Sequence, residues 1–322
     1  MRAKLPIINA FIAAVIASLF SWYYQNIKAQ NYARGLISSP SELVSQSYNR
    51  TNIALLGIGG AGHEGGELTD SIMIASLNHK THLVTLLSIP RDIWLTSSKS
   101  KINSIYYYAE KRSPGSGLVS IQESLNSVTG IPIHYSVLID FSGFIKAIDA
   151  IGGITINVEN SFDDYKYPIP GKENAEPESA RYEHLHFDAG IQKMDGVTAL
   201  KFVRSRHAIG DEGTDFARSA RQQKVIYGFI TSFLSPDSIF NVERVSALKN
   251  SISQSVQTNI PDAHVTALIK LGLSIDFEKI STFSIESQLY NPKNLAPYAG
   301  AWVLMPKNSW EDIHSYVQAN LK

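Results

Sequence analysis

The stretch Ser71–Ile89, SIMIASLNHKTHLVTLLSI, decides the fold. It contains two apolar runs, Ser71–Leu77 and His82–Ile89, on either side of the polar tetrapeptide Asn78–Thr81. Short apolar runs flanking a polar turn are typical of a β-hairpin. A third run, Asn52–Ile58, precedes the hairpin and ends in a glycine-rich turn. We therefore predict a β-sheet that contains at least these three strands.

Strands and helices alternate after the hairpin. Leu118–Val128 and Phe141–Ile151 have the apolar spacing of helices, and His134–Ile139 between them reads as a strand. Ile154–Val158 predicts a further strand and Val197–Val203 a further helix. This alternation predicts the α/β class, as a three-layer α/β/α sandwich with a mixed central sheet.

Two segments depart from this alternation. Phe162–Glu183 is polar and charged and contains Pro168, Pro170 and Pro177, so we predict a surface excursion. After about Ser235 the pattern becomes mainly helical, and this part either completes the preceding domain or is appended to it. Its helical runs lie near residues 241–255, 262–272 and 310–321, with a possible strand near 281–286.

A carboxylate and a guanidinium are predicted to meet at one end of the hairpin. Asp70 begins the first strand, and Arg91 follows Pro90 at the end of the second. In an antiparallel pair the start of one strand lies beside the end of the other. Proline cannot donate to the ladder, so Pro90 ends the pairing. Ligands of α/β sheets bind in such crevices at strand ends.

The stretch Arg204–Gln222, RSRHAIGDEGTDFARSARQ, carries a second group of charges. Thr214 is a good helix N-cap residue, so a helix is predicted to begin there. At ~100° per residue, Asp215, Arg218 and Gln222 share one stripe, with Arg221 at its border. The same stripe continues downstream with the apolar residues Val225, Ile226, Phe229 and Phe233.

Arginines in the first turns of this helix oppose its dipole, which favours negative charge at an N-terminus. A bound phosphate would remove the conflict, because guanidinium groups and free backbone N–H groups both bind phosphate oxygens. The alternative is a structural network in which Asp215 pairs with Arg218 and further ion pairs surround them. The stretch by itself leaves both readings open.

The N-terminus contains a candidate membrane segment. Leu5–Tyr24 has about the ~20 uncharged residues needed to cross a bilayer. Arg2 and Lys4 precede it, and it ends in Trp22-Tyr23-Tyr24. We predict a signal anchor in the cytoplasmic membrane with the rest of the chain extracytoplasmic; a cleaved signal peptide and a buried core helix are the alternatives. The predicted segments are 1–28 (tail and anchor), 29–50 (linker), 51–235 (catalytic domain) and 236–322 (C-terminal extension).

Composition narrows the function. Lys and Arg total 29, as do Asp and Glu, so the formal net charge is zero and no global field recruits nucleic acid. An anion site must therefore be a local arginine cluster. The chain has no cysteine, which excludes disulfides, thiol nucleophiles and cysteine-ligated zinc.

In kind and order, these motifs resemble those of the LytR-CpsA-Psr family. The resemblance covers roughly Asn52–Phe233, and the motifs are specific in combination although each alone is weak. The residues that carry it are Thr69-Asp70-Ser71, Ser88-Ile89-Pro90-Arg91-Asp92, Lys101-Ile102-Asn103, Asp140-Phe141-Ser142-Gly143-Phe144, Ile151-Gly152-Gly153, Asp195-Gly196 with Ala199-Leu200, Arg204-Ser205-Arg206, Asp215, Arg218 and Arg221-Gln222-Gln223.

The resemblance implies a membrane-anchored phosphotransferase. Such proteins move a glycopolymer from a polyisoprenoid pyrophosphate to a hydroxyl of peptidoglycan, assisted by Mg²⁺, and hold the lipid in an apolar tunnel with arginines at its mouth. The helix Phe141–Ile151 either walls that tunnel or is ordinary core. The implied partners are the lipid-linked glycan, peptidoglycan and the membrane, without nucleic acid.

The family's functional positions carry over onto this sequence. Asp70 is implied to hold Mg²⁺, with a plain turn aspartate as the alternative. Arg91 is implied to clamp the pyrophosphate, unless it only pairs with Asp92. Asp215 would orient Arg218 or activate the acceptor hydroxyl, and we favour orientation because neighbouring arginines lower its proton affinity. The implied pyrophosphate ligands are Arg204, Arg206, Arg218, Arg221 and Gln222. A purely structural role is the alternative for Gln222 and for one of the two residues Arg204 and Arg206.

This chain departs from the family pattern at two places. Gly59-Gly60 stands where an aspartate is common, and Leu68 where an arginine is common. Either the pyrophosphate clamp has one charge fewer, or the loop containing His63, Glu64 and Glu67 supplies a substitute charge. A metal site is a further interpretation of that loop. Two other functions stay open, a polyprenyl-pyrophosphate phosphatase and a non-enzymatic envelope regulator or lipid sensor.

Overall fold

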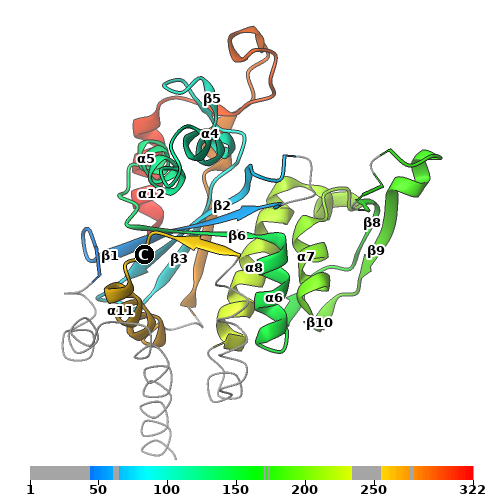
Figure 1. Cartoon of the computed structure of the whole chain (residues 1–322), viewed down its shortest axis with the longest axis horizontal. Coiled ribbons are helices and arrows are strands. Elements are labelled where there is room, and N and C mark those ends of the chain that lie inside the picture. Colours follow the sequence, from blue (N-terminus) through cyan, green and yellow to red (C-terminus); the bar gives the residue numbers. More distant parts are fainter. Residues whose placement is uncertain are drawn as a thin grey trace, which may run out of the picture.

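The computed structural model describes residues 44–60, 65–169, 171–172, 174–233, 255–275 and 279–321. A six-stranded sheet in the order β11-β6-β1-β2-β3-β12 forms its centre (Figure 1). β2 (Thr69–Asn78) and β3 (Val84–Ser88) form the predicted antiparallel hairpin, and β1 (Arg50–Ile58) pairs antiparallel with β2. The three strands expected from the sequence are confirmed.

The sheet is mixed, as predicted. β6 (Tyr135–Asp140) runs parallel to β1, and β12 (Ser281–Ser284) runs parallel to β3. β11 (Val256–Thr258) pairs antiparallel with β6. Both edge strands come from residues after Phe233, so that part of the chain completes the central sheet. The helical run expected near residues 241–255 lies almost entirely outside the described residues.

Helices cover both faces of the sheet (Figure 1). On one face α4 (Ile105–Arg112), α5 (Gly117–Thr129) and α12 (Trp310–Asn320) pack on the inward residues of β1, β2 and β3. On the other face α8 (Asp215–Phe233) and α11 (Asp262–Leu273) pack on the alternate residues of the same strands. Successive side chains of the hairpin strands point to opposite faces of the sheet, so the hairpin contributes to an apolar core on each face.

A third apolar cluster lies beside the sheet. It joins α6 (Phe141–Ala150) and α7 (Gly196–Arg204) to the strands β7 (Ile154–Val158) and β10 (Gly190–Met194). α6 follows β6 directly, and Asp140 caps it by accepting a hydrogen bond from Gly143 N. Two small sheets lie apart from the central one and pair β4 (Trp94–Leu95) with β5 (Ser100–Lys101) and β13 (Leu289–Tyr290) with β14 (Met305–Pro306).

The prediction of a surface excursion over Phe162–Glu183 is wrong for its two ends. They form the antiparallel pair β8 (Phe162–Pro168) and β9 (Tyr182–Phe187). Phe162, Asp164 and Tyr167 are buried, whereas Pro168 ends β8 and Pro177 lies in the connection. The inward face mixes two aromatic rings with a carboxylate, so hydrophobic alternation alone did not reveal the strands.

The predicted anchor Leu5–Tyr24 lies outside the described residues, as does the predicted linker up to residue 43. Across the part of the chain that the structure describes, no helix combines the length and the apolar character that a bilayer span requires.

Two partly buried histidines, His79 and His134, contact the first residues of β1. Nε2 of His79 lies 2.8 Å from the hydroxyl oxygen of Thr51, and the backbone N–H of Asn52 donates to Nδ1 of His134 at 2.9 Å. Burial is the main cause that lowers the pKa of both imidazoles below the usual 6.5. The folded state therefore favours their neutral forms.

We expect the thermal midpoint to fall as the pH drops from 7 to 5. In the unfolded chain both histidines take up a proton near pH 6.5, whereas in the folded chain they do so only at lower pH. Their contribution to the free energy of unfolding is therefore complete above pH 6.5 and is lost as the pH falls below it. A His79→Gln/His134→Gln variant should show a smaller pH dependence in differential scanning fluorimetry. Replacing the exposed His207 by Gln is the matched control; equal slopes for the double variant and the original chain would contradict the assignment.

Candidate functional site

The predicted contact between Asp70 and Arg91 is present. Nη1 of Arg91 donates to Oδ1 of Asp70 at 2.5 Å, and the two side chains are 23% and 43% exposed. Arg91 Nε also lies 3.4 Å from Asp92, whose other oxygen accepts from Lys101 Nζ at 2.6 Å. The pairing with Asp92 thus accompanies the contact with Asp70 rather than replacing it. A ligand can reach both side chains from solvent.

Backbone contacts fix the position of this pair. Ile89 N donates to Ile72 O at 3.0 Å, which is the last bond between β2 and β3 before Pro90 ends the ladder. Beyond it, the N–H of Asn103 donates to the carbonyl of Arg91 at 3.3 Å. The hydroxyl of Thr69, next to Asp70, donates to the carbonyl of Asn103 at 3.0 Å. Asn103 therefore ties the two strand ends together.

Helix α8 crosses the sheet at the same end. The hydroxyl of Ser71 donates to Oε1 of Gln222 at 3.2 Å, and Gln223 Nε2 donates to the hydroxyl of Ser88 at 3.1 Å. Gln222 thus contacts Ser71, which follows Asp70 on β2; consecutive residues of a strand point to opposite faces of the sheet. Arg218 is half-buried and lies one turn earlier on the face of Gln222.

The start of α8 agrees with the sequence. Thr214 precedes the helix with an extended backbone, and its hydroxyl accepts a hydrogen bond from Ala217 N at 3.1 Å. The predicted N-cap is therefore confirmed. Asp215 is the first residue of α8, and its side chain lies outside what the structure describes.

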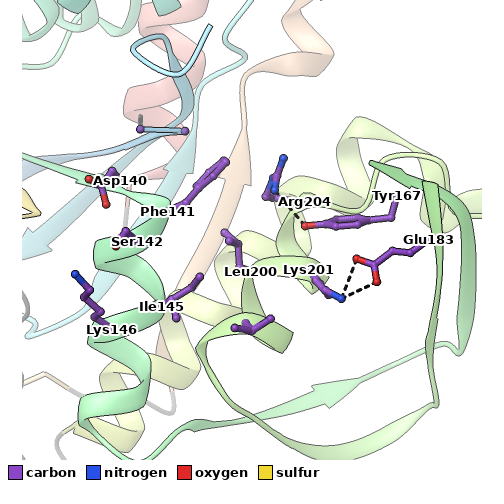
Figure 2. Close-up of a pocket in the computed structure, with 13 residues that line it drawn as sticks. Asp140, Phe141, Ser142, Ile145, Lys146, Tyr167, Glu183, Leu200, Lys201 and Arg204 are labelled. Atoms are coloured by element: carbon purple, nitrogen blue, oxygen red, sulfur yellow. Dashed lines mark hydrogen bonds and ion pairs between the residues drawn. The ribbon is translucent and has the colours of Figure 1, made fainter. Parts of the chain in front are cut away.

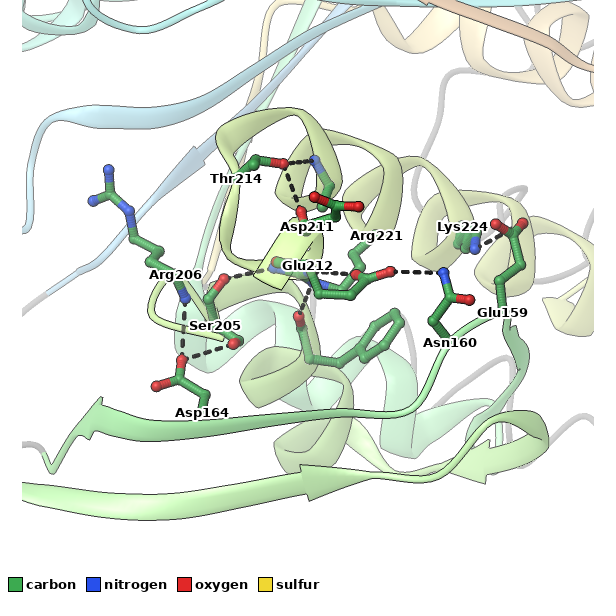
Figure 3. Close-up of polar contacts among 12 residues, drawn as sticks. Glu159, Asn160, Asp164, Ser205, Arg206, Asp211, Glu212, Thr214, Arg221 and Lys224 are labelled. Carbon is green, nitrogen blue, oxygen red and sulfur yellow. Dashed lines mark hydrogen bonds and ion pairs between the residues drawn. The ribbon is translucent and has the colours of Figure 1, made fainter. Parts of the chain in front are cut away.

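Arg221 does not join the group around Asp70. It is 2% exposed, and its guanidinium donates to the carbonyls of Phe202, Glu212 and Ser205 and to the Glu212 carboxylate (Figure 3). These bonds measure 2.7–3.0 Å. For this residue the geometry favours the structural network over the predicted phosphate ligand.

Arg206 is exposed, and its side chain extends away from the Arg221 network (Figure 3). Its backbone N–H instead donates to Oδ2 of Asp164 at 3.2 Å. The same oxygen accepts from the hydroxyl of Ser205 at 2.7 Å and from His207 N at 3.2 Å. A completely buried carboxylate thus holds the turn that leads from α7 to α8.

Sequence reasoning missed the role of Asp164. Burial alone would raise the pKa of this carboxyl, but hydrogen bonds from Ser205 and from three backbone N–H groups outweigh it and lower the pKa. Asp164 therefore stays ionised and structural. In the sequence it is one carboxylate of an Asp-Asp pair in a polar segment, and nothing there marks it as buried.

A cavity of about 480 Å³ opens beside this turn (Figure 2). Apolar side chains from α6 and α7, including Phe141, Ile145 and Leu200, form part of its wall, and cations line it as well. Of the two alternatives left open for the helix at 141–151, each holds for part of it: Phe141 and Ile145 line the cavity, while Ala147 and Ile148 belong to the core. The lining comprises Gly59, Gly60, Asp140, Phe141, Ser142, Ile145, Lys146, Tyr167, Glu183, Val197, Leu200, Lys201 and Arg204.

Arg204 is held inside this cavity by two aromatic rings. Its guanidinium carbon lies 4.5 Å from the ring centre of Phe141 and 5.5 Å from that of Tyr167. Nη1 also donates to the hydroxyl of Tyr167 at 3.2 Å (Figure 2). Stacking on aromatic faces restricts a guanidinium while leaving its edge for an anion. Of Arg204 and Arg206, it is Arg204 that faces the cavity.

The cavity and the Asp70–Arg91 pair lie at the same end of the sheet. Ile58, which precedes the lining residue Gly59, pairs with Thr69 on one side and with Asp140 on the other. Gly60 has φ +80°, and a Cβ there would come within 3.1 Å of the Cβ of Asp140. A side chain at position 60 would therefore be strained. The strand ends thus place Asp70 next to the cavity rim.

The loop proposed to supply substitute charges is only partly described. His63 and Glu64 lie outside the described residues, and Glu67 is exposed. In the ranges that the structure covers, no group of three or more His, Asp or Glu side chains could hold a metal unaided.

A family model described as the LytR_cpsA_psr family matches residues 19–315. The chain belongs to this family. The LytR-CpsA-Psr match extends past Phe233, where the sequence motifs ended, and this agrees with the completion of the sheet by β11 and β12.

Two relatives within the LytR-CpsA-Psr family show the extent of the similarity. The chain is 30% identical over 263 residues to the polyisoprenyl-teichoic acid–peptidoglycan teichoic acid transferase TagV of Bacillus subtilis, covering 79% of this chain and 61% of TagV. It is 26% identical over 218 residues to the cell wall biosynthesis protein LcpA of Corynebacterium glutamicum, covering 61% of this chain and 39% of LcpA. The chain thus spans less than two thirds of the length of either relative.

Solved structures share the fold. The crystal structure of B. subtilis TagV aligns with a TM-score of 0.60 at 24% identity, over 86% of this chain and 98% of the chain in that crystal structure. The structure of TagT bound to LIIa-WTA aligns with a TM-score of 0.58 at 16% identity, over 89% of this chain and 97% of the chain in that structure. The mixed α/β architecture is therefore that of the LytR-CpsA-Psr family.

Proposed function

We propose that this protein is a membrane-anchored phosphotransferase. It moves a glycopolymer from a polyisoprenoid-pyrophosphate carrier to a hydroxyl of peptidoglycan. The observation that carries the proposal is the arrangement at one sheet end, where the Asp70–Arg91 pair adjoins a partly apolar cavity that contains Arg204. The name of TagV, a polyisoprenyl-teichoic acid–peptidoglycan teichoic acid transferase, supports the same reaction class.

The residues suit an amphiphilic pyrophosphate. Phe141, Ile145 and Leu200 offer apolar surface to a lipid chain, and Arg204 lies at its polar end. Arg91 supplies further positive charge beside Asp70, and Arg218 lies one turn before Gln222, which contacts Ser71. Phosphoryl transfer depends chiefly on positioning and charge stabilisation, so such a set requires no covalent nucleophile.

The proposed step replaces the phosphoanhydride bond of the pyrophosphate by a phosphodiester bond. The oxygen of the acceptor hydroxyl bonds to the glycan-bearing phosphorus, the bond from that phosphorus to the bridging oxygen breaks, and the lipid phosphate leaves with the electron pair. The acceptor hydroxyl loses its proton to solvent. Arg91 and Arg204 stabilise the charge that accumulates on the phosphate oxygens, while Arg221 and Asp164 hold α8 and the preceding turn in place.

Magnesium fits this site at Asp70. Mg²⁺ in phosphoryl-transfer sites is bound through one or two carboxylates together with substrate phosphates. Asp70 is a single carboxylate, 43% exposed, with Oδ1 bound to Arg91. Mg²⁺ at Asp70 would neutralise pyrophosphate oxygens. The side chain of Asp70 would hold the ion and also orient Arg91.

The predicted anchor would place the site near its lipid substrate. With Leu5–Tyr24 in the cytoplasmic membrane and the remaining chain outside, the protein would meet both the lipid carrier and peptidoglycan. The opposite orientation would separate the enzyme from its acceptor.

A transfer assay tests the function. The full chain in detergent is given a polyisoprenoid-pyrophosphate-linked glycan, Mg²⁺ and peptidoglycan fragments, and the products are analysed by mass spectrometry. We expect a glycan–peptidoglycan phosphodiester and one lipid phosphate for each transfer. Release of lipid phosphate at the same rate without acceptor, with no conjugate formed, would identify a phosphatase instead. No turnover of any lipid-linked glycan would favour the regulator.

A further inference from the structure

An ordered loop near the C-terminus projects from the molecule beside the segment that follows Arg91 (Figure 1). It spans residues 291–304 between the paired strands β13 and β14. Gly300 N donates to Leu295 O at 3.0 Å, and Asn291 Nδ2 donates to Val303 O at 2.8 Å. Hydrogen bonds within the loop therefore stabilise its conformation.

The loop is attached to the chain that carries Arg91. Ile93 and Leu304 form a parallel bridge, in which Leu304 N donates to Asp92 O at 2.9 Å and Trp94 N donates to Leu304 O at 3.0 Å. Arg91 lies two residues before Ile93, and Trp302 lies two residues before Leu304. Because the two chains run in the same direction, Arg91 and Trp302 leave the bridge on the same side.

Large aromatic side chains of this region face solvent. Trp302 is 49% exposed and Tyr290 46% exposed, whereas the neighbouring Val303 is fully buried and anchors the loop. Tyr298 and Trp94 are partly buried and stand edge-on to each other with ring centres 5.4 Å apart. Exposed aromatic groups on a rigid support mark interaction surfaces, because each ring offers a large contact area at little entropic cost.

The backbone of the loop is strained where it presents these rings. Ala299 and Gly300 adopt φ values of +55° and +77° in succession. A left-handed backbone at a residue other than glycine is unfavourable and persists only where the surroundings impose it. The turn between Tyr298 and Trp302 is thus held in one conformation.

The order of the strands separates this loop from the cavity. The cavity rim is formed at the ends of β1 and β6, the Asp70–Arg91 pair lies at the ends of β2 and β3, and the loop adjoins the chain after β3. In phosphoryl transfer the attacking and leaving oxygens lie on opposite sides of the phosphorus. If the lipid lies in the cavity, an acceptor that attacks from the opposite side would approach past the loop.

We propose that Trp94, Tyr298 and Trp302 form the subsite that binds the acceptor glycan strand. This inference rests on the proposed transferase function. Pyranose rings have an apolar CH face that packs on Trp and Tyr rings and hydroxyl groups that stay hydrated or hydrogen-bonded. Residues 289–304 contain one formal charge, Lys293, which suits an uncharged sugar backbone better than a polyanion.

Saccharide binding tests the subsite separately from catalysis. Isothermal titration of the full chain with a β-1,4-linked N-acetylglucosamine tetramer should show binding. Trp302→Ala should weaken it about tenfold, the effect of losing one aromatic contact, and Trp302→Phe should retain most of it. Tyr48→Ala, which removes an exposed tyrosine near the start of β1, should bind like the original chain. Equal binding by Trp302→Ala and the original chain would overturn the proposal.

Enzyme kinetics supply the second readout. In the transfer assay Trp302→Ala should raise the KM for peptidoglycan fragments about tenfold and leave the release of lipid phosphate to water unchanged. An equal loss of both reactions would show a structural role for the loop and overturn the subsite. Loss of binding to lipid vesicles in place of saccharide would show a membrane contact and overturn it as well. Absence of all turnover in the original chain, with saccharide binding still dependent on Trp302, would refute the transferase and retain the glycan subsite.

Discussion

Replacement of Arg91 by alanine is expected to lower the rate of glycan transfer by ~10³ or more, the contribution of one arginine that stabilises a phosphoryl transition state. Arg91 lies just after β3 with its side chain 23% exposed, and it contacts Asp70 at 2.5 Å. The ladder between β2 and β3 consists of backbone hydrogen bonds up to Ile89. The substitution should therefore remove charge from the site while the hairpin stays folded.

Three further variants make this test specific. Arg91→Lys keeps the positive charge but loses the planar fork of donors, so it should restore only part of the rate. Asp70→Asn keeps the shape of the side chain and should increase the Mg²⁺ concentration needed for half-maximal rate. Arg206→Ala removes an exposed arginine that extends away from the buried network and should have little effect.

Initial rates and thermal midpoints are measured for every variant. A near-normal rate for Arg91→Ala would refute the clamp. A thermal midpoint that falls far enough to explain the lost rate by unfolding would do the same.

Local patterns in the sequence predicted the contact between Asp70 and Arg91. The two residues flank a hairpin, and the geometry of antiparallel pairing alone brings such ends together. The N-cap at Thr214 also depends only on nearby residues, because its hydroxyl accepts a hydrogen bond from the backbone N–H of Ala217 in the first turn of the helix. Both predictions needed no knowledge of the surrounding packing.

Long-range packing could not be read in this way. Arg218 and Arg221 differ by less than one helical turn, yet Arg221 is 2% exposed and Arg218 is half-buried, because carbonyls at Phe202 and Ser205 and the carboxylate of Glu212 converge on Arg221. These partners lie 9 to 19 residues earlier in the chain. Asp164 was missed for the same reason, since its ligands come from the turn after α7.

The loop at residues 291–304 poses a related problem. Its attachment to Ile93 joins parts of the chain about 200 residues apart. The sequence shows several aromatic residues in this loop but does not show which residues lie near them in space. Only the structure brings them next to Arg91.

Replacement of Arg221 by methionine is expected to lower the free energy of unfolding by about 3–5 kcal/mol, the usual effect of removing one member of a buried charged group. Methionine fills similar space but cannot donate to the carbonyls of Phe202 and Ser205, and it leaves the Glu212 carboxylate without this cation. Urea denaturation followed by fluorescence measures the change.

The same experiment decides between the two readings of Arg221. Adding Glu212→Gln should recover part of the loss, since the remaining partner then carries no charge, and the double-mutant cycle gives the coupling between the two side chains. Arg206→Met at an exposed position should change stability by no more than about 0.5 kcal/mol. If Arg221→Met instead unfolds like the original chain but no longer transfers glycan, Arg221 contacts the pyrophosphate during turnover. The buried network would then have to open when the substrate binds, because all the contacts of its guanidinium described above are to protein atoms.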